Sequence, residues 1–147
     1  MQPQDRSYYP SLPDERACNI WLALEDVTAE SGCLAFADSP LDDPTPLRTH
    51  WPAGGGGGAL QCEGPAPEAV TLAPLRAGSV TVHSARTLHW AGGNSTAAPR
   101  RGYVVQTRPA ASVRTARRFG FDHGRFAGNT AEERAARGAG IVIEAPK

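Results

Sequence analysis

The sequence predicts a mainly β fold, a sandwich or barrel of short strands with one short helix near the end of the chain. Apolar runs of strand length occur at residues 17–24, 33–37, 69–72, 79–83 and 102–107, and turns separate them. Several short runs bounded by turn residues favour an all-β domain over an α/β one. The chain has 147 residues, which is the length of a single domain.

Residues 17–24 are almost continuously apolar, with charged residues on both sides, so we expect a central strand there. Residues 25–32 are acidic and turn-like, with Gly32 at the bend, and residues 33–37 continue as a second strand. We expect these two strands to pair with each other in antiparallel orientation.

Residues 38–67 are predicted to be a long loop, because prolines occur throughout and five successive glycines stand at 54–58. No Gly-Lys-Ser/Thr sequence follows the glycines, which argues against a phosphate-binding loop. Further on, Thr130-Ala131-Glu132-Glu133 has the form of a capping box and predicts a short helix that ends at Gly138. We therefore expect an ordered domain over residues 1–108 and a tail with a short helix over residues 109–147.

The composition excludes several classes of partner. Fifteen basic residues balance fifteen acidic ones, so no net charge attracts nucleic acid or a membrane surface. Cys18, Cys33 and Cys62 are too few and too scattered for a disulfide framework, and no apolar run approaches the roughly 20 residues that span a bilayer. We expect a cytoplasmic protein whose partner is a small molecule, and the sequence carries no signal for an oligomeric state.

Two residues are candidate metal ligands. An iron(II) site of the oxygenase kind needs two histidines and one carboxylate on one face, with the remaining positions open. His89 is the best imidazole, because it stands at a strand end before a turn of small residues at 91–93, and Asp5 is the matching carboxylate. The alternative is that His89 is a structural histidine and that Asp5 is simply solvated.

Arg100 follows His89 by eleven residues and stands at the start of the next predicted strand. A guanidinium at this place can hold a carboxylate through two hydrogen bonds. Arg101 has the opposite parity, so one of the two arginines should point into the barrel and the other outward. The alternative for Arg100 is an exposed arginine at the rim. Asn94 is expected to support the intervening loop by binding backbone groups.

Taken together, three blocks resemble the phytanoyl-CoA dioxygenase family of iron(II)/2-oxoglutarate oxygenases. They are Gln4-Asp5 with Tyr8, residues 21–34 from Trp21 onward, and residues 78–101 with Gly78-Ser79-Val80, His83-Ser84, Leu88-His89 and Arg100-Arg101. The resemblance covers about the first 108 residues and corresponds to the C-terminal half of such an enzyme. It implies a double-stranded β-helix, or cupin-like jelly roll, that hydroxylates a small organic or lipid-like substrate.

The resemblance also implies roles for single residues. Iron(II) would be held by the aspartate of a His-x-Asp motif, here Asp5, and by a distal histidine, here His89. Arg100 would bind the far carboxylate of the cosubstrate 2-oxoglutarate. Trp21 would lie beside the cosubstrate, with Gln4 and Tyr8 near the same pocket.

The resemblance implies no catalytic side chain beyond these metal and cosubstrate ligands. His83 matches a family histidine that is usually not a ligand, and we treat it as structural.

The chain departs from the family at position 3, where Pro3 stands in place of the first metal-binding histidine. Proline cannot coordinate iron, and His50, His83 and His123 are the other histidines that could replace the missing ligand. The resemblance also begins at the family's metal-binding strand, so we expect the β-helix to be incomplete at its N-terminus.

Three hypotheses remain open: a truncated or diverged oxygenase, an inactive remnant that serves as a binding module or partner subunit, and a chain whose coding sequence extends upstream.

Overall fold

The computed structural model describes residues 4–8, 10, 14, 16–38, 48, 50–52, 60–62 and 69–121. In these residues the fold is mainly β, as predicted, with one α-helix and one short 3-10 helix. The elements in chain order are η1 (Asp5–Tyr8), β1 (Cys18–Ala23), β2 (Leu34–Ala37), β3 (His50–Pro52), β4 (Leu60–Cys62), β5 (Val70–Ala73), β6 (Val80–Ser84), β7 (His89–Ala91), β8 (Gly102–Thr107) and α1 (Ala110–Arg118).

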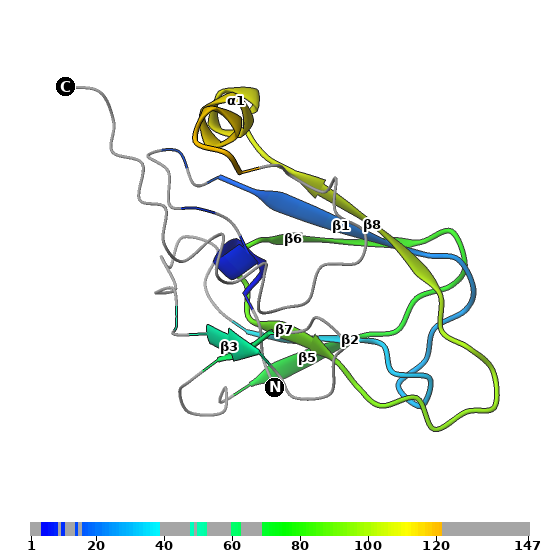
Figure 1. Cartoon of the computed structure of the whole chain (residues 1–147). Helices are drawn as coiled ribbons and strands as arrows, with labels where there is room; N and C mark the ends of the chain where they lie inside the picture. Colours follow the sequence, from blue (N-terminus) through cyan, green and yellow to red (C-terminus); the bar gives the residue numbers. More distant parts are fainter. Residues whose placement is uncertain are drawn as a thin grey trace.

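Most strands belong to two antiparallel three-stranded sheets that form two layers (Figure 1). One sheet has the order β6-β1-β8 and the other the order β5-β2-β7, while β3 and β4 form a separate two-stranded pair. The central place of β1 confirms the prediction from its apolar sequence. The predicted pairing of the first two strands is wrong, because β1 and β2 lie in different sheets.

The connection between β1 and β2 explains why they do not pair. Val27 forms an isolated bridge with Leu75, which leads the chain away from the first sheet. Gly32 then turns the backbone with φ of +83°, and a Cβ at this position would lie 2.6 Å from the carbonyl oxygen of Gly92. A glycine is therefore required both by the backbone conformation and by the close approach of the two chains.

The inner face of the β6-β1-β8 sheet carries the core. Alternate residues of β1 are buried, as a strand with one covered face requires. Trp21 and Ala23 from this face pack with residues that lead into and begin β2. The cluster consists of Trp21, Ala23, Val27, Cys33 and Leu34, with Phe36 and Leu75 packed against it.

The helix α1 was not predicted from the sequence. Val113 N donates to the carbonyl of Pro109 at 3.1 Å to start the helix, and Ser112 Oγ donates to the carbonyl of Asp14 at 3.0 Å. The helix ends at Arg118, and Gly120 just beyond it has a φ of +84°. Gly120 N donates to the carbonyl of Arg117 at 3.0 Å, and Phe121 N donates to the carbonyl of Ala116 at 3.0 Å. These bonds form a Schellman motif.

Four sequence features lie outside the described residues: Pro3, the glycines at 54–58, His123 and the predicted helix at 130–138. The segment predicted as a loop at 38–67 contains the short strands β3 and β4, which the sequence did not indicate. No helix within the described ranges is long and apolar enough to cross a membrane.

Candidate metal centre

Asp5 is held beside the turn that joins β6 to β7. The neighbours of Asp5 make the contacts: the Gln4 side chain donates from Nε2 to the carbonyl of Arg86 at 2.8 Å, and Arg6 N donates to the carbonyl of Ala85 at 2.8 Å. Gln4 is fully buried and Arg6 is 2% exposed. The two contacts flank Asp5 and fix the start of η1 against this turn.

The same turn brings two histidines together. His83 lies in β6 and His89 begins β7, so the two residues belong to opposite sheets. A bond from Thr87 N to the carbonyl of Ser84 at 3.0 Å closes the turn between them. Their ring centroids are 4.6 Å apart, and the ring of Phe36 lies 5.1 Å from His83 and 6.1 Å from His89. The two imidazoles are thus packed against one aromatic ring.

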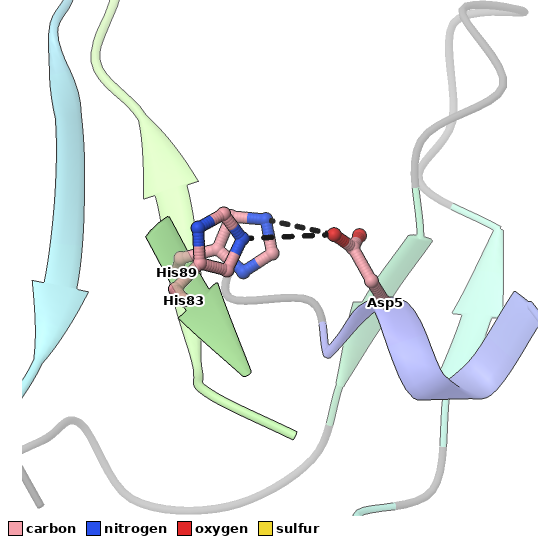
Figure 2. A group of neighbouring side chains, drawn as sticks. All are labelled: Asp5, His83 and His89. Carbon is pink, nitrogen blue, oxygen red and sulfur yellow. Dashed lines mark ion pairs between the residues drawn. The ribbon is translucent and has the colours of Figure 1, made fainter. Parts of the chain in front are cut away.

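Both histidines point a ring nitrogen at the carboxylate of Asp5 (Figure 2). The distance to Asp5 Oδ2 is 3.6 Å from His89 Nε2 and 3.8 Å from His83 Nε2. The side chains are 7% exposed at His83, 12% at His89 and 15% at Asp5. One donor atom from each residue lies within 4.8 Å of the others, a spacing that could hold a metal ion. Two imidazoles and one carboxylate are the donor set of a facial iron(II) site.

Hydrogen bonds orient two of these three side chains. Asn19, which is 1% exposed, donates from Nδ2 to Asp5 Oδ2. His89 donates from Nδ1 to the carbonyl of Thr87 at 3.0 Å, because a carbonyl oxygen only accepts. In the neutral tautomer that makes this bond, Nε2 carries the lone pair, and this is the form that binds metals. Asn19 was missed in the sequence, although an amide in the middle of an apolar strand was a readable signal.

Unpaired polar atoms gather near this cluster. In the described part of the chain, five buried side-chain atoms lack a hydrogen-bond partner: Asn19 Oδ1, Thr81 Oγ1, His83 Nδ1, His83 Nε2 and Arg100 Nη1. Register pairs Asn19 with His83 and Trp21 with Thr81, so these residues share the inner face of one sheet. A buried polar group without a partner costs about 1–3 kcal/mol. Several of them on one face indicate a site built for polar ligands.

Arg100 and Arg101 lie in different surroundings. The guanidinium carbon of Arg100 stands 5.5 Å from the centre of the Trp21 ring, and its Nη1 is buried without a partner. Arg101 is exposed instead and pairs with Glu25, with Nη2 at 3.0 Å from Oε2. Its guanidinium lowers the pKa of the Glu25 carboxyl through this hydrogen bond. Of these two arginines, Arg101 therefore pairs with a carboxylate in the described structure, and Arg100 does not.

Gly102 fixes the place of the Trp21 ring. A Cβ at position 102 would lie 2.7 Å from Trp21 Nε1 and closer still to two carbons of the ring. The indole of Trp21 thus lies directly against the backbone of β8, beneath the guanidinium of Arg100.

Asp5, His83 and His89 line a cavity of about 420 Å³. It opens between the two sheets, and its lining consists of Asp5, Trp21, Leu34, His83, His89, Val104 and Gln106. Gln4, Tyr8 and Arg100 do not belong to this lining, and Arg100 lies against its Trp21 wall. The side chain of Gln4 binds two backbone groups instead. Its Nε2 donates to the carbonyl of Arg86, and its Oε1 accepts from Arg48 N at 2.9 Å.

His50 has both ring nitrogens engaged. Its Nε2 accepts from Gln4 N at 3.1 Å, and its Nδ1 lies 2.6 Å from the carbonyl of Arg48 and 2.8 Å from Ser7 Oγ. Burial lowers the pKa of His50. His50 therefore supports the segment that carries Asp5 and does not reach the cluster as a ligand.

Asn94 makes the loop contacts that were expected of it. Its Nδ2 donates to the carbonyl of Ala98 at 2.8 Å, and its Oδ1 accepts from Thr96 N at 2.9 Å.

Comparison with known proteins relates the chain to one family. The family described as phytanoyl-CoA dioxygenase (PhyH) matches residues 3–102. Among solved structures, EvdO2 from Micromonospora carbonacea var. aurantiaca is 32% identical, covers 71% of this chain and has a TM-score of 0.57. The same protein complexed with 2-oxoglutarate is 31% identical over 74% of the chain, with a TM-score of 0.59. The epimerase SnoN in complex with Fe3+, alpha ketoglutarate and nogalamycin RO is 27% identical over 86% of the chain, with a TM-score of 0.54.

The chain is shorter than these structures. It spans 43% and 46% of the two EvdO2 chains and 50% of the SnoN chain. No curated protein sequence is a significant match.

Proposed function

The chain belongs to the phytanoyl-CoA dioxygenase family, and on that premise we propose that it is an iron(II)/2-oxoglutarate-dependent dioxygenase that hydroxylates a small organic or lipid-like substrate. The observation that carries the proposal is the approach of Asp5 and His89 within a cavity, at 3.6 Å between Oδ2 and Nε2. Structural relatives that were solved with 2-oxoglutarate or with Fe3+ support the choice of cofactors.

The residues present fit the proposed metal. Asp5 and His89 would each supply one donor atom, and the Thr87 carbonyl already selects the tautomer of His89 that leaves Nε2 free. Asn19 would hold the carboxylate of Asp5 in place, and its buried Oδ1 remains unpaired. When bound, iron(II) and 2-oxoglutarate would supply the electrons that activate dioxygen for the oxidation of an unactivated C–H bond.

Arg100 would bind the far carboxylate of 2-oxoglutarate. A buried guanidinium nitrogen without a partner favours this role, because a carboxylate can accept from both arms of the guanidinium. Trp21 would form the wall beside the cosubstrate, since its ring contacts Arg100 and lines the cavity. Gln4 and Tyr8 would lie near this pocket without lining it. Gln4 would act indirectly, through the backbone contacts that position Asp5.

The proposed fold is a double-stranded β-helix, or cupin-like jelly roll. Residues 1–108 would form its C-terminal part, which agrees with a chain that spans half or less of its structural relatives. Residues 109–147 would form an appended tail. The free thiols of Cys18, Cys33 and Cys62 agree with a cytoplasmic location.

A second candidate function is that of a binding module without catalysis. Pro3 favours it, because this residue stands where the family has a metal-binding histidine. Such a module would keep Arg100 and the cavity, and bind a carboxylate ligand without converting it.

Succinate formation from 2-oxoglutarate separates the two candidates. The chain is incubated with iron(II), 2-oxoglutarate and oxygen, and succinate is measured for the wild type, for Asp5→Asn and for Asp14→Asn. Asp14 is the matched control, because its carboxylate pairs with Arg16 outside the cavity. We expect succinate from the wild type and from Asp14→Asn, but not from Asp5→Asn. A wild type that binds 2-oxoglutarate and forms no succinate would establish the binding module instead.

A further inference from the structure

We propose that His83 is the third protein ligand of the metal and replaces the histidine that the family has at position 3. This inference rests on the proposed function and assigns one more residue to the same site. His83 is not the residue that the family resemblance points to, and the geometry of this chain alone leads to it. The result would be a complete set of two histidines and one carboxylate, formed by Asp5, His83 and His89.

The burial of His83 is the first argument. Its side chain is 7% exposed, and neither Nδ1 nor Nε2 has a hydrogen-bond partner. An imidazole buried in this way loses its bonds to water and gains none in return. His89, by contrast, has its Nδ1 bonded to Thr87. A metal ion beside Asp5 would bind His83 Nε2 directly, where Asp5 Oδ2 at 3.8 Å is too far away to form a hydrogen bond.

The distances are the second argument. Ligand nitrogen and oxygen atoms lie about 2.1 Å from a metal such as zinc, so two adjacent donors stand about 3 Å apart and no two stand beyond about 4.2 Å. The distances from Asp5 Oδ2 to His89 Nε2 and His83 Nε2 are 3.6 and 3.8 Å. For a metal to bind, each of these two oxygen–nitrogen distances would shorten to about 3 Å. That change is less than about 1 Å, and rotation of the side chains can provide it.

The two sheets build this arrangement. His83 pairs with Asn19 across β6 and β1, and Asn19 donates to Asp5, so the sheet places the carboxylate and this imidazole together. Phe36 packs against both imidazoles from the other sheet. Among the three histidines in the described ranges, His50 is the one that is committed elsewhere, through Gln4 and Arg48.

Metal affinity tests the inference without any measurement of activity. Cobalt(II) serves as the probe, and its dissociation constant is measured by calorimetry for the wild type, His83→Ala, His89→Ala and His123→Ala. Loss of a residue that only supports a ligand costs about 10- to 100-fold in metal affinity, so loss of a ligand should cost more than about 100-fold. We expect that loss from His83→Ala and from His89→Ala. His123→Ala tests the other histidine that could fill this position, and a loss of affinity from His123→Ala in place of His83→Ala would overturn the role of His83.

A second measurement needs no variant and protects the test against a His83→Ala chain that fails to fold. X-ray absorption of the cobalt(II)-loaded wild type is expected to show scattering from two imidazole rings. Restored affinity on adding Pro3→His to His83→Ala would further support the view that the two histidines fill one coordination position.

The outcomes separate the inference from the proposed function. A single imidazole in the spectrum, or an unchanged affinity in His83→Ala while His89→Ala loses binding, would overturn the role of His83 and leave the proposed function standing. A wild type that binds no cobalt(II) or iron(II) would overturn both.

Discussion

Replacement of Arg100 by alanine is expected to remove most of the affinity for 2-oxoglutarate. The guanidinium would form two charge-assisted hydrogen bonds with the far carboxylate, each contributing about 1.5–3 kcal/mol. Their loss corresponds to about 3–6 kcal/mol, which raises the dissociation constant roughly 150- to 25,000-fold. Little compensation is expected, because Nη1 is buried and has no other partner in the described structure.

The assay is calorimetric titration of the cobalt(II)-loaded chain with 2-oxoglutarate. Arg101→Ala is the matched control, since this neighbouring arginine is 69% exposed and pairs with Glu25 outside the cavity. Arg100→Lys should show an intermediate loss, because an ammonium keeps the charge but cannot bind a carboxylate through two parallel bonds. Equal losses from Arg100→Ala and Arg101→Ala would refute the reasoning, as would an Arg100→Ala chain with wild-type affinity.

Three other changes test the surroundings of the site. Gly102→Ala should displace the Trp21 ring and destabilise the fold by about 1–3 kcal/mol, as overpacking does. The measurements are Trp fluorescence and the unfolding midpoint in urea. If both are unchanged, the close contact between residue 102 and the Trp21 ring is contradicted. Asn19→Ala should weaken cobalt(II) binding by about 10- to 100-fold, because Asp5 loses the donor that orients it, and an unchanged dissociation constant would show that Asp5 is held in another way.

His50 should make stability depend on pH, since burial lowers its pKa below the ordinary value of 6.5 for histidine. The stabilisation is then complete above about pH 6.5 and declines as the pH falls toward the lower folded pKa, because the unfolded chain binds the proton more readily. Thermal unfolding between pH 7.5 and pH 5 should be less pH-dependent in His50→Asn, and identical profiles would exclude this role.

Local sequence patterns predicted where the strands lie better than which strands pair with each other. The apolar run at 17–24 correctly indicated the central strand β1, because burial on a sheet face can be read from the residues themselves. The choice of partner depends on where the chain crosses between sheets, and here Val27 and Gly32 carry it to the opposite layer. Short-range pairing is the default expectation for neighbouring strands, and this crossing overrides it.

The helix α1 was missed because its buried side is made of small residues. Ser112 and Ala116 face the protein, and neither gives the large apolar spacing by which amphipathic helices are recognised. Pro109 was placed at the start of the predicted tail over residues 109–147, although proline is also common at helix starts.

The candidate site was predicted in part. Asp5, His89, Arg100 and Trp21 could be named through the family resemblance, and the structure places them around or beside one cavity. His83 lies six residues before His89 on a different sheet, so its approach to Asp5 depends on the turn between β6 and β7. A contact that depends on two sheets facing each other cannot be obtained from spacing along the chain.

The most direct test of the account is an anaerobic titration of the iron(II)-loaded wild-type chain with 2-oxoglutarate, followed by visible absorbance. If Asp5 and His89 hold iron(II) beside Arg100, a charge-transfer band of the iron(II)–2-oxoglutarate chelate should appear and saturate at one equivalent. The same titration of Asp5→Asn should give no band. A wild-type chain that gives no band would contradict the claim that this cavity holds the metal and the cosubstrate together.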